Sequence, residues 1–428
     1  MTSTLLKSPP LNAPTIHKLP NGLTIVAEQM PVDAVNLNVW FNVGSALESD
    51  AINGMAHFLE HMIFKGTSRL KCGEFERLIE ERGAVTNAAT SQDYTHYYIT
   101  TAPKDFAELA PLQLEVVMNP SIPDEDFAKE RLVVLEEIRR SQDNPSRRTY
   151  RHAMETCFTK LPYNRQVLGP AEVIEQLQPQ QMRDFHSSWY QPQSMTAAVV
   201  GNLPVEELIS IVAEGLPTID RPFLPTPDRP QLESEVPFTG IVRQEVVEER
   251  LQQGRLVMCW RVPGMEQLEE TYALDVLAVI LGQGKLSRLY RDLREERGLV
   301  SHIGASNLTY ALQGVFYISA ILPSENIPEV EEAIAEHIGK LQTELIAQAD
   351  IERIRTLVAN RFIFGNEKPS ARANLYGYYQ SQLGDLAPAM NYTEKIQALS
   401  AQDLQKAAQS YLSKKAYGVV AVRPPEGK

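Results

Sequence analysis

Cysteine is scarce in this chain. Its 428 residues include only three, Cys72, Cys157 and Cys259, and none of them belongs to a C-x-x-C pair. An odd, widely scattered set does not indicate a disulfide framework, and it fits a reducing compartment. We interpret all three as small buried residues.

A long apolar run and an excess of basic residues are also missing. No stretch approaches the ~20 apolar residues that a membrane-spanning helix needs. The N-terminal segment has no apolar core and is interrupted by Pro9, Pro10 and Pro14, so it does not match a secretory signal. The formal net charge of −13 argues against nucleic acid or an anionic membrane as the main partner. We expect a soluble, cytoplasmic protein without a membrane span or a nucleic-acid partner. Prior removal of an organelle-targeting segment stays open.

The length of the chain exceeds one ordinary hydrophobic core, so two domains of about 200 residues are expected. The clearest boundary is a stretch over residues 217–237 that contains six prolines, a density that neither a helix nor a central strand tolerates. We predict a first domain over residues 1–217, a Pro-rich linker over 218–240 and a second domain over 241–428.

The two blocks look like distant repeats of each other. Each contains a strand-like run followed by a helix, then an alternating segment that suggests a strand pair, then long helices, and finally a helix followed by a β-branched strand. The matching ranges are 37–45 and 255–264, 83–102 and 298–322, 122–145 and 348–369, and 177–201 and 399–422. Because strands and helices do not alternate regularly, we predict an α+β fold. Two homologous domains, each a mostly antiparallel or mixed sheet with helices packed on it, would form a clam-like cleft.

The motif that carries chemistry is HFLEH, residues 57 to 61. On a helix, His57 and His61 stand four residues apart and project from the same face, and Glu60 lies at the edge of that face. Two neutral imidazoles can bind Zn²⁺, and a nearby carboxylate can take a proton from a zinc-bound water. The order H-x-x-E-H is the reverse of the commoner zinc-protease motif. The flanking residues are mostly apolar, which argues against a merely solvated helix face.

A catalytic zinc ion needs a third protein ligand. The segment FAKERLVVLEEIRRSQ, residues 127 to 142, is a good place to find it, because Glu130 and Glu137 are seven residues apart and share a helix face. The residues alone leave two roles open for Glu136 and Glu137, ligation or a surface salt bridge.

At this point the sequence resembles the pitrilysin-type inverted zincins. It is most similar to the mitochondrial processing peptidase β-subunits and their short bacterial relatives. The resemblance covers nearly the whole chain and includes GMAHFLEHMIFKGT, GAVTNAATSQDYTHYY and LEEIRR. It implies His57, His61 and Glu137 as zinc ligands and Glu60 as the catalytic general base. It further implies that Glu130, seven residues before the third ligand, supports the catalytic site.

The resemblance also implies how a substrate is held. In relatives, an extended peptide pairs with a strand that matches residues 85–90, where Asn87 and Ala88 match the family's Asn-Ala pair. Arg294 matches an arginine that the second domain of active relatives contributes. Ser301 stands where those relatives have a tyrosine, and its shorter side chain cannot deliver the same hydrogen bond. Tyr310 is a conceivable substitute in another strand.

We therefore predict a zinc-dependent metalloendopeptidase that cleaves peptides or presequences held in extended form in a closed chamber. The substitution at Ser301 suggests the catalytic subunit of a two-chain processing peptidase, with a homologous partner in a heterodimer; a homodimer is the other possibility. One alternative is a non-catalytic scaffold subunit of the respiratory-complex core-protein type. Another is an oligopeptide-binding chamber with incidental metal.

Overall fold

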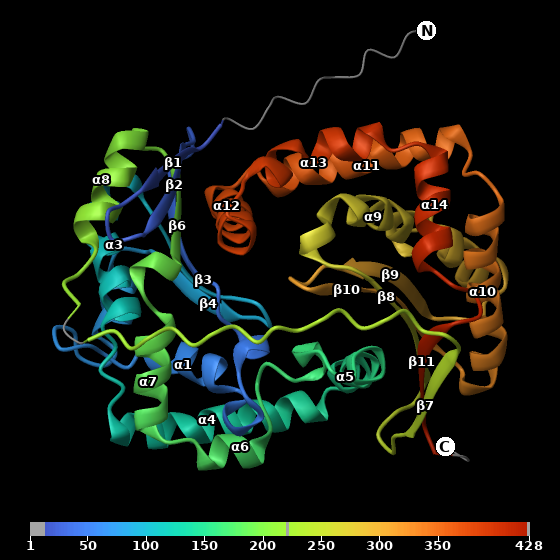
Figure 1. Cartoon of the computed structure of the whole chain (residues 1–428), viewed down its shortest axis with the longest axis horizontal. Helices are drawn as coiled ribbons and strands as arrows, with labels where there is room; N and C mark the ends of the chain where they lie inside the picture. The colour runs from blue at the N-terminus through green and yellow to red at the C-terminus, as the bar shows by residue number, and fades with distance from the viewer. Residues whose placement is uncertain (1–12, 220–221, 426–428) are drawn as a thin grey trace, which may run out of the picture. The chain divides into compact units, whose positions relative to one another are not determined.

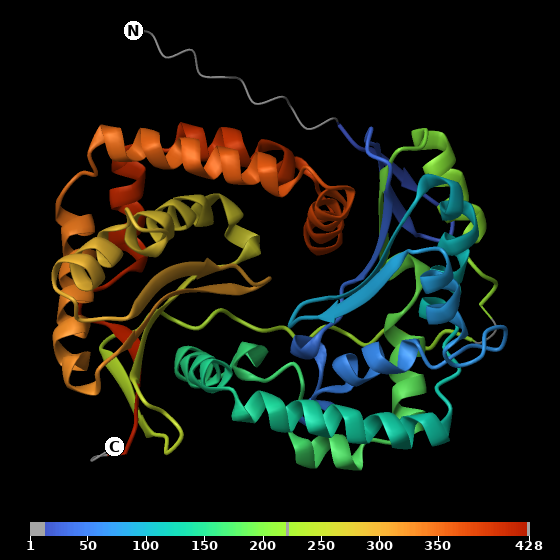
Figure 2. The same cartoon turned by 180° about the vertical axis from the view of Figure 1, so that it is seen from behind.

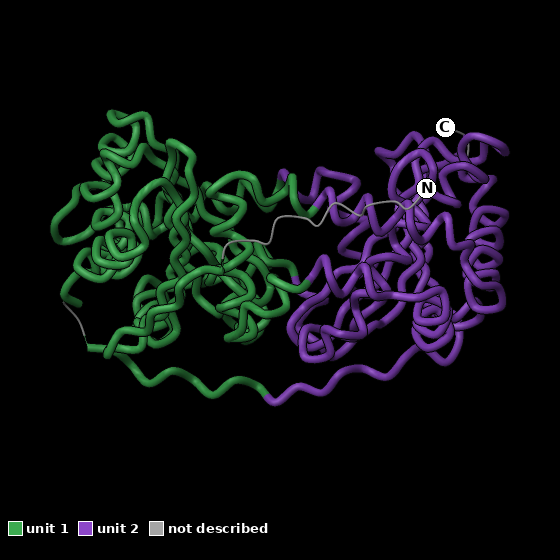
Figure 3. Tube along the Cα trace, turned by 90° about the horizontal axis from the view of Figure 1, so that it is seen from above, with its two compact units in different colours: residues 1–139, 166–230, 362–391 green, residues 140–165, 231–361, 392–428 purple. Residues whose placement is uncertain are grey.

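The computed structural model describes residues 13–219 and 222–425 and divides into two compact units. The chain is followed from end to end in Figures 1 and 2. Unit 1 comprises residues 1–139, 166–230 and 362–391, and unit 2 comprises residues 140–165, 231–361 and 392–428 (Figure 3). The units are therefore interleaved along the sequence.

Unit 1 is built on a mixed six-stranded sheet with the order β1-β2-β6-β3-β5-β4. Only the β2–β6 pair is parallel, and the other neighbours are antiparallel. The strands β2 and β6 are rich in β-branched and small apolar residues, and β3 and β6 are buried along their whole length, as central strands should be. The strands are β1 (Thr15–Lys18), β2 (Thr24–Gln29), β3 (Val35–Phe41), β4 (Val85–Thr90), β5 (Thr95–Thr101) and β6 (Met195–Gly201).

Helices cover both faces of this sheet. The main core of unit 1 lies on one face, where the apolar sides of α1, α3, α7 and α8 pack against the sheet. The opposite face is covered by α12, which packs on β3 and β6 through a smaller cluster that includes Ala373 and Tyr376 (Figure 1). The helices that lie wholly or mainly in unit 1 are α1 (Met55–Ile63), α2 (Glu74–Glu81), α3 (Pro103–Met118), α4 (Asp124–Asp143), α6 (Ala171–Gln176), α7 (Pro179–Trp189), α8 (Val205–Gly215) and α12 (Pro369–Leu383).

Unit 2 repeats this plan with a five-stranded sheet of order β7-β11-β8-β10-β9. Its β7–β11 pair is parallel and the rest are antiparallel. The core lies between this sheet and α9, α10 and α14, and α5 packs on the other face. The elements are β7 (Ile241–Val247), β8 (Gly254–Pro263), β9 (His302–Leu308), β10 (Gln313–Leu322), β11 (Tyr417–Arg423), α5 (Pro145–Cys157), α9 (Leu268–Gly282), α10 (Ile327–Thr343), α11 (Gln348–Gly365), α13 (Ala387–Ala398) and α14 (Ala401–Tyr411).

The two sheets share one topology. If β1 is left aside, the five strands of each sheet lie side by side in the same order: first, fifth, second, fourth and third along the sequence. The predicted α+β fold with two homologous mixed-sheet domains is thus confirmed.

The covering helices are exchanged between the halves of the sequence. Helix α5 comes from the N-terminal half and packs in unit 2, whereas α12 comes from the C-terminal half and packs in unit 1. The division at residues 218–240 therefore separates the two repeats but not the two compact units, and as a domain boundary it stays a prediction. Among the described residues of 217–237 there is no helix or strand.

Two further observations concern the sequence-based expectations. Cys157 and Cys259 are buried as expected, but Cys72 is exposed, which corrects that interpretation for one of the three cysteines. Within the described ranges, every helix is too short or too polar to cross a membrane.

Candidate metal centre

Helix α1 carries the HFLEH motif and is anchored at its N-terminus by a buried carboxylate. Glu48 accepts hydrogen bonds from the backbone N–H groups of Gly54 and Ala56, each at 2.7 Å. These are amide groups that a helix leaves without an internal partner. Gly54 has φ 98°, a left-handed conformation that favours glycine. Sequence reasoning missed Glu48, which has no spacing relation to the motif.

The packing of α1 fixes which of its faces is free for chemistry. Met55, Phe58, Leu59 and Met62 are fully buried in the core of unit 1. The ring of Phe58 stacks on Phe127 of α4 with 4.5 Å between centroids, which fastens α4 against α1. This contact brings the later part of α4 opposite the histidine face.

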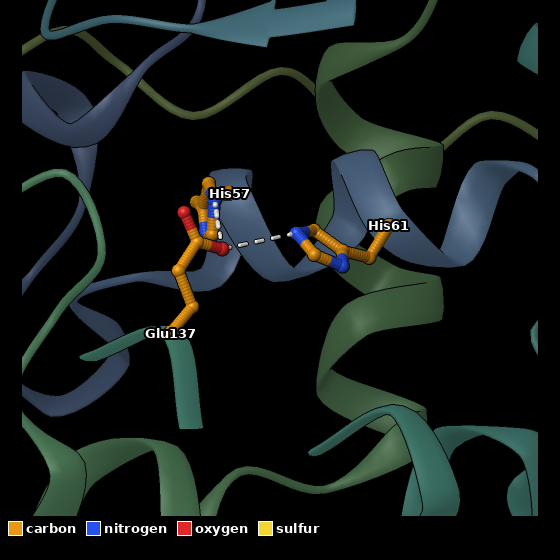
Figure 4. Close-up of side chains that lie close together, drawn as sticks. All are labelled: His57, His61 and Glu137. Atoms are coloured by element: carbon orange, nitrogen blue, oxygen red, sulfur yellow. Dashed lines mark ion pairs between the residues drawn. The ribbon is translucent and has the colours of Figure 1, made fainter. Parts of the chain in front are cut away.

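The side chains of His57, His61 and Glu137 converge at this place (Figure 4). Glu137 Oε2 lies 3.5 Å from His57 Nε2 and 3.6 Å from His61 Nε2. One ligand atom from each of the three residues lies within 4.8 Å of the other two. Within the described part of the chain, this is the one group of three or more such residues close enough to hold a metal ion.

The three donors fit a zinc ion. Ligand atoms about 2.0–2.2 Å from a tetrahedral zinc ion are about 3.3–3.6 Å apart, which matches the separations of Glu137 Oε2 from the two histidine nitrogens. Two imidazole nitrogens and one carboxylate oxygen are a known catalytic zinc set that leaves a fourth position for water. Glu136, the other candidate, instead pairs with Arg139 at 2.8 Å on the surface of α4.

A second glutamate orients one of the histidines. Glu130 Oε1 lies 2.9 Å from His61 Nδ1, and its other oxygen lies 2.7 Å from Lys65 Nζ. The pKa of Glu130 is lowered mainly by the hydrogen bond from His61, so the carboxylate is ionised. An ionised acceptor at Nδ1 holds the proton there and leaves Nε2 free as a metal donor.

The electrostatics of the two histidines differ. Burial lowers the pKa of His57 to about 4, assisted by His61 and opposed by Glu137. Burial also acts to lower the pKa of His61, but hydrogen bonds with Glu130 and Glu137 outweigh it and raise that pKa to about 9. His57 is therefore a neutral donor at neutral pH, whereas a cation bound at His61 must compete with a proton.

Glu60 lies between His57 and His61 along α1. Its Oε2 accepts a hydrogen bond of 2.5 Å from Thr90 Oγ1, at the end of β4. Burial raises the pKa of Glu60 above its ordinary value, and the bond from Thr90 opposes this rise. A carboxylate whose pKa lies above the usual range, close to two metal donors, is well placed to accept and return a proton. Thr90 is a contact that the sequence did not point to.

Asn87 and Ala88 lie on β4, which is an edge strand of the sheet. The side-chain oxygen of Asn87 accepts a hydrogen bond from the backbone N–H of Ala88 at 2.9 Å. Among the described residues, β4 pairs only with β5, so its other edge offers backbone groups to an added strand.

The remaining predicted residues belong to unit 2. Arg294 lies in a π-helical segment, Tyr290–Glu296, where its guanidinium stacks over the Tyr290 ring at 4.7 Å. Ser301 donates a hydrogen bond to the carbonyl of Ile321 at 3.0 Å. Tyr310 lies in the turn after β9 rather than in a strand, which corrects that expectation, and its hydroxyl is 2.7 Å from that of Tyr150.

A zinc-dependent metallopeptidase is the class of protein that this fold and donor set define. Two family models match the chain: "Insulinase (Peptidase family M16)" over residues 24–171 and "Peptidase M16 inactive domain" over residues 176–358. The first match contains all three metal donors. The chain belongs to peptidase family M16.

Similar proteins are known in bacteria. An "Uncharacterized zinc protease" of Rickettsia felis is 27% identical over 399 residues, which cover 93% of this chain and 95% of the relative. "Zinc protease PqqE" of Helicobacter pylori is 28% identical over 413 residues, covering 95% and 92%. The expected hydrolase activity, metalloprotease class and Zn²⁺ cofactor are confirmed; the specific likeness to mitochondrial processing peptidase β-subunits stays a prediction.

Solved structures agree with this assignment. The crystal structure of a protease from Helicobacter pylori superposes with a TM-score of 0.89 at 28% identity, covering 97% of this chain and all of the other. A structure described as a peptidase M16 inactive domain from Pseudomonas fluorescens gives a TM-score of 0.85 at 19% identity. At that identity the likeness concerns the fold alone.

Proposed function

We propose that this chain is a zinc metalloendopeptidase in which His57, His61 and Glu137 hold the metal and Glu60 is the general base. The observation that carries the assignment is the convergence of the three donors, together with the position of Glu60 on the same helix as His57 and His61. When bound, zinc supplies Lewis-acid polarisation of a carbonyl and lowers the pKa of a water molecule. Glu60 accepts the proton of the attacking water and returns it to the leaving amine. Glu130 keeps His61 in the tautomer that exposes Nε2.

The substrate is a peptide in extended conformation along β4. The unpaired edge of β4 offers main-chain hydrogen bonds that require neither a particular side chain nor a free terminus. The hydrogen bond from Thr90 to Glu60 ties the end of this strand to the general base. A peptide that pairs with β4 near Asn87 and Ala88 therefore lies close to Glu60. Cleavage is internal, because the peptide can extend beyond β4 in both directions.

Substrate contacts from the second repeat are incomplete in this chain. Ser301 is occupied by a hydrogen bond to a backbone carbonyl of its own unit. Arg294 remains the candidate to bind the peptide. We take the chain as the zinc subunit of a two-chain enzyme that encloses presequence-like peptides in a chamber, with a homologous partner that supplies the missing groups.

The general base is tested by replacing Glu60 with glutamine in the purified, zinc-loaded chain, which is assayed alone and with a homologous partner chain. Removing the proton acceptor should lower the hydrolysis of an unfolded peptide by at least about 10²-fold, while zinc content stays at wild-type level. Glu81→Gln is the matched control, because the Glu81 side chain is exposed on α2 and pairs with Arg77. Full hydrolysis by Glu60→Gln would reject the role of Glu60. A wild-type chain that binds zinc and hydrolyses no peptide, either alone or with a homologous partner chain added, would instead favour a scaffold.

The two-chain arrangement has its own assay. Turnover by the purified chain alone is compared with turnover after a homologous M16 chain of the same organism that lacks the H-x-x-E-H motif is added. We expect activity to rise on mixing and to depend on Glu60 of this chain. Full turnover alone, unchanged by the added chain, would refute the requirement for a partner.

A further inference from the structure

Unit 2 contains a pocket that is separate from the metal donors. It has a volume of about 320 Å³ and lies between α5 and one face of the second sheet. This is the face opposite α9, as Figure 1 shows. Its volume falls at the lower end of the range for small-molecule sites, about 300–1,000 Å³. The space suits one or two amino-acid residues.

The walls of the pocket follow from strand register and helix spacing. Arg255 of β8 pairs with Ile321 of β10, which pairs with His302 of β9, so these three side chains form one row across the sheet face. The next rows contribute Val257 and Ser319, then Cys259 and Tyr317. Helix α5 supplies side chains at positions 146, 149, 150, 153 and 154, which share one helix face.

Among the described residues that line the pocket, Arg255 is the one arginine or lysine. Its Nη1 donates a hydrogen bond to Ser146 Oγ at 3.0 Å, but its buried Nε has no partner among the described residues. The nearby carboxylate of Glu248 is already engaged by Arg148. Arg255 forms no ion pair within the described part of the chain, and burial lowers the pKa of its guanidinium. A partly buried guanidinium whose neighbouring carboxylate is already paired with another arginine is a ready site for an anion.

The rest of the pocket selects among anions. Val257, Val315, Ile321 and the α5 residues Ala153 and Met154 form an apolar wall beside the charged row. A compact inorganic anion would leave that wall facing water, whereas a carboxylate attached to an apolar side chain satisfies both parts. A terminal residue of a peptide has this combination.

We infer that this pocket binds the C-terminal residue of a peptide, with its carboxylate on Arg255 and its apolar side chain against the wall. The inference rests on the proposed function in one respect: a peptidase that cleaves internally produces a new C-terminal carboxylate at every turnover. The pocket is then a second peptide-binding site of the chain, located in unit 2, for the terminus of a substrate or of a product.

The experiment uses the full-length, zinc-loaded chain and probes that an endopeptidase does not cleave. Binding of N-acetyl-leucine and of N-acetyl-leucinamide is titrated by ligand-observed NMR. The acid should bind about ten-fold or more tightly than the amide, because only the acid forms charged hydrogen bonds with Arg255. Arg255→Gln should abolish this difference, and Ser319→Phe, which fills the pocket and keeps the arginine, should weaken both probes. The matched control is Arg353→Gln, an exposed arginine of α11.

A peptide arm separates a peptide terminus from a free acid. A leucine-terminated pentapeptide and its amide are titrated against Glu60→Gln, and the free-acid pentapeptide should be preferred by a similar factor. Equal affinities for acid and amide, or a preference that survives Arg255→Gln, would overturn the inference, because the carboxylate would then bind elsewhere, for example at the metal. Preference for N-acetyl-leucine without preference for the free pentapeptide would reject the peptide terminus. Failure of wild-type hydrolysis with a homologous partner chain present would reject the proposed function alone, since binding at Arg255 is measured independently.

Discussion

Replacement of Glu130 tests the metal centre without touching a metal donor. Glu130 contacts His61 Nδ1 at 2.9 Å and Lys65 Nζ at 2.7 Å. Removing the carboxylate leaves His61 without its acceptor and Lys65 as an uncompensated positive charge near the cation. Both changes should weaken zinc binding, and neither removes a ligand.

The size of the effect follows from the type of contact. A hydrogen bond to a charged group contributes about 1.5–3 kcal/mol, equivalent to roughly 10–150-fold in affinity. Loss of a group that orients a ligating histidine typically costs about 10–100-fold in metal affinity. The amide oxygen of Glu130→Gln can still accept from Nδ1, so we expect about ten-fold. Glu130→Ala has no acceptor and should approach 100-fold.

Zinc affinity is measured by competition with a chromogenic chelator at fixed pH. The matched control is Glu136→Gln, on the same helix, because Glu136 pairs with Arg139 on the surface. Its affinity should equal that of wild type. Wild-type affinity in both Glu130 variants, or an equal loss in Glu136→Gln, would refute the argument that Glu130 orients His61.

Three further predictions concern stability. A Cβ on Gly377 would lie 2.0 Å from Trp40 Nε1, so Gly377→Ala should destabilise the chain by about 1–3 kcal/mol in thermal unfolding. A Cβ on Gly365 would meet nothing within 4 Å, so Gly365→Ala is the control that should leave stability unchanged. Unchanged stability of Gly377→Ala would contradict the close packing of α12. Burial lowers the pKa of His96 from 6.5 to about 4 in the folded chain. As the pH falls, the unfolded chain is therefore protonated at His96 before the folded chain, and up to about 3 kcal/mol of stability is lost between about pH 6.5 and pH 4. In denaturant titrations at several pH values, the free energy of unfolding of His96→Gln should fall less steeply over this range than that of wild type. An identical fall in both proteins would exclude His96 as the cause. Removing zinc with a chelator should lower the melting temperature, because zinc at 1,000 times its Kd stabilises the folded state by about 4 kcal/mol; an unchanged calorimetric transition would show that the folded chain gains nothing from the metal.

The part of the site that lies within one helix was accessible from the sequence. His57, Glu60 and His61 are fixed relative to one another by helical geometry, so a five-residue pattern predicts which face they share. Glu137 could be named only through the resemblance, because its approach to His57 depends on how α4 packs on α1. That packing is set by contacts such as Phe58 on Phe127, and no local pattern encodes them.

Burial on α4 was harder to anticipate. Residues 132–135 form an apolar run in the sequence, but the structure buries it unevenly: Val134 is fully buried, whereas Leu132 and Val133 are 67% and 51% exposed. A continuous apolar run on a helix covers every direction, so the sequence cannot say which side faces the core. Glu48 and Thr90 escaped notice for a related reason: each acts through a contact made by the folded chain.

The strand repeats were visible in the sequence, but the exchange of α5 and α12 was not. Periodicity identifies a helix and its apolar face, yet it does not say which sheet receives that face. Arg372 and Tyr376 of α12 contact the buried carboxylate of Glu28 in β2, more than 340 residues earlier in the chain. Such a polar contact only becomes apparent once the sheet and the helix are placed together.

This exchange of helices has an evolutionary consequence. Two identical halves, each lending its covering helix to the other, are what a domain-swapped homodimer looks like. The present chain has the form of such a dimer after gene duplication and fusion, with the Pro-rich segment as the join. The first half alone lacks α12 and leaves one face of its sheet bare. Expressed as separate polypeptides, the two halves should therefore depend on each other to fold, and a cut within the join should leave the fragments associated.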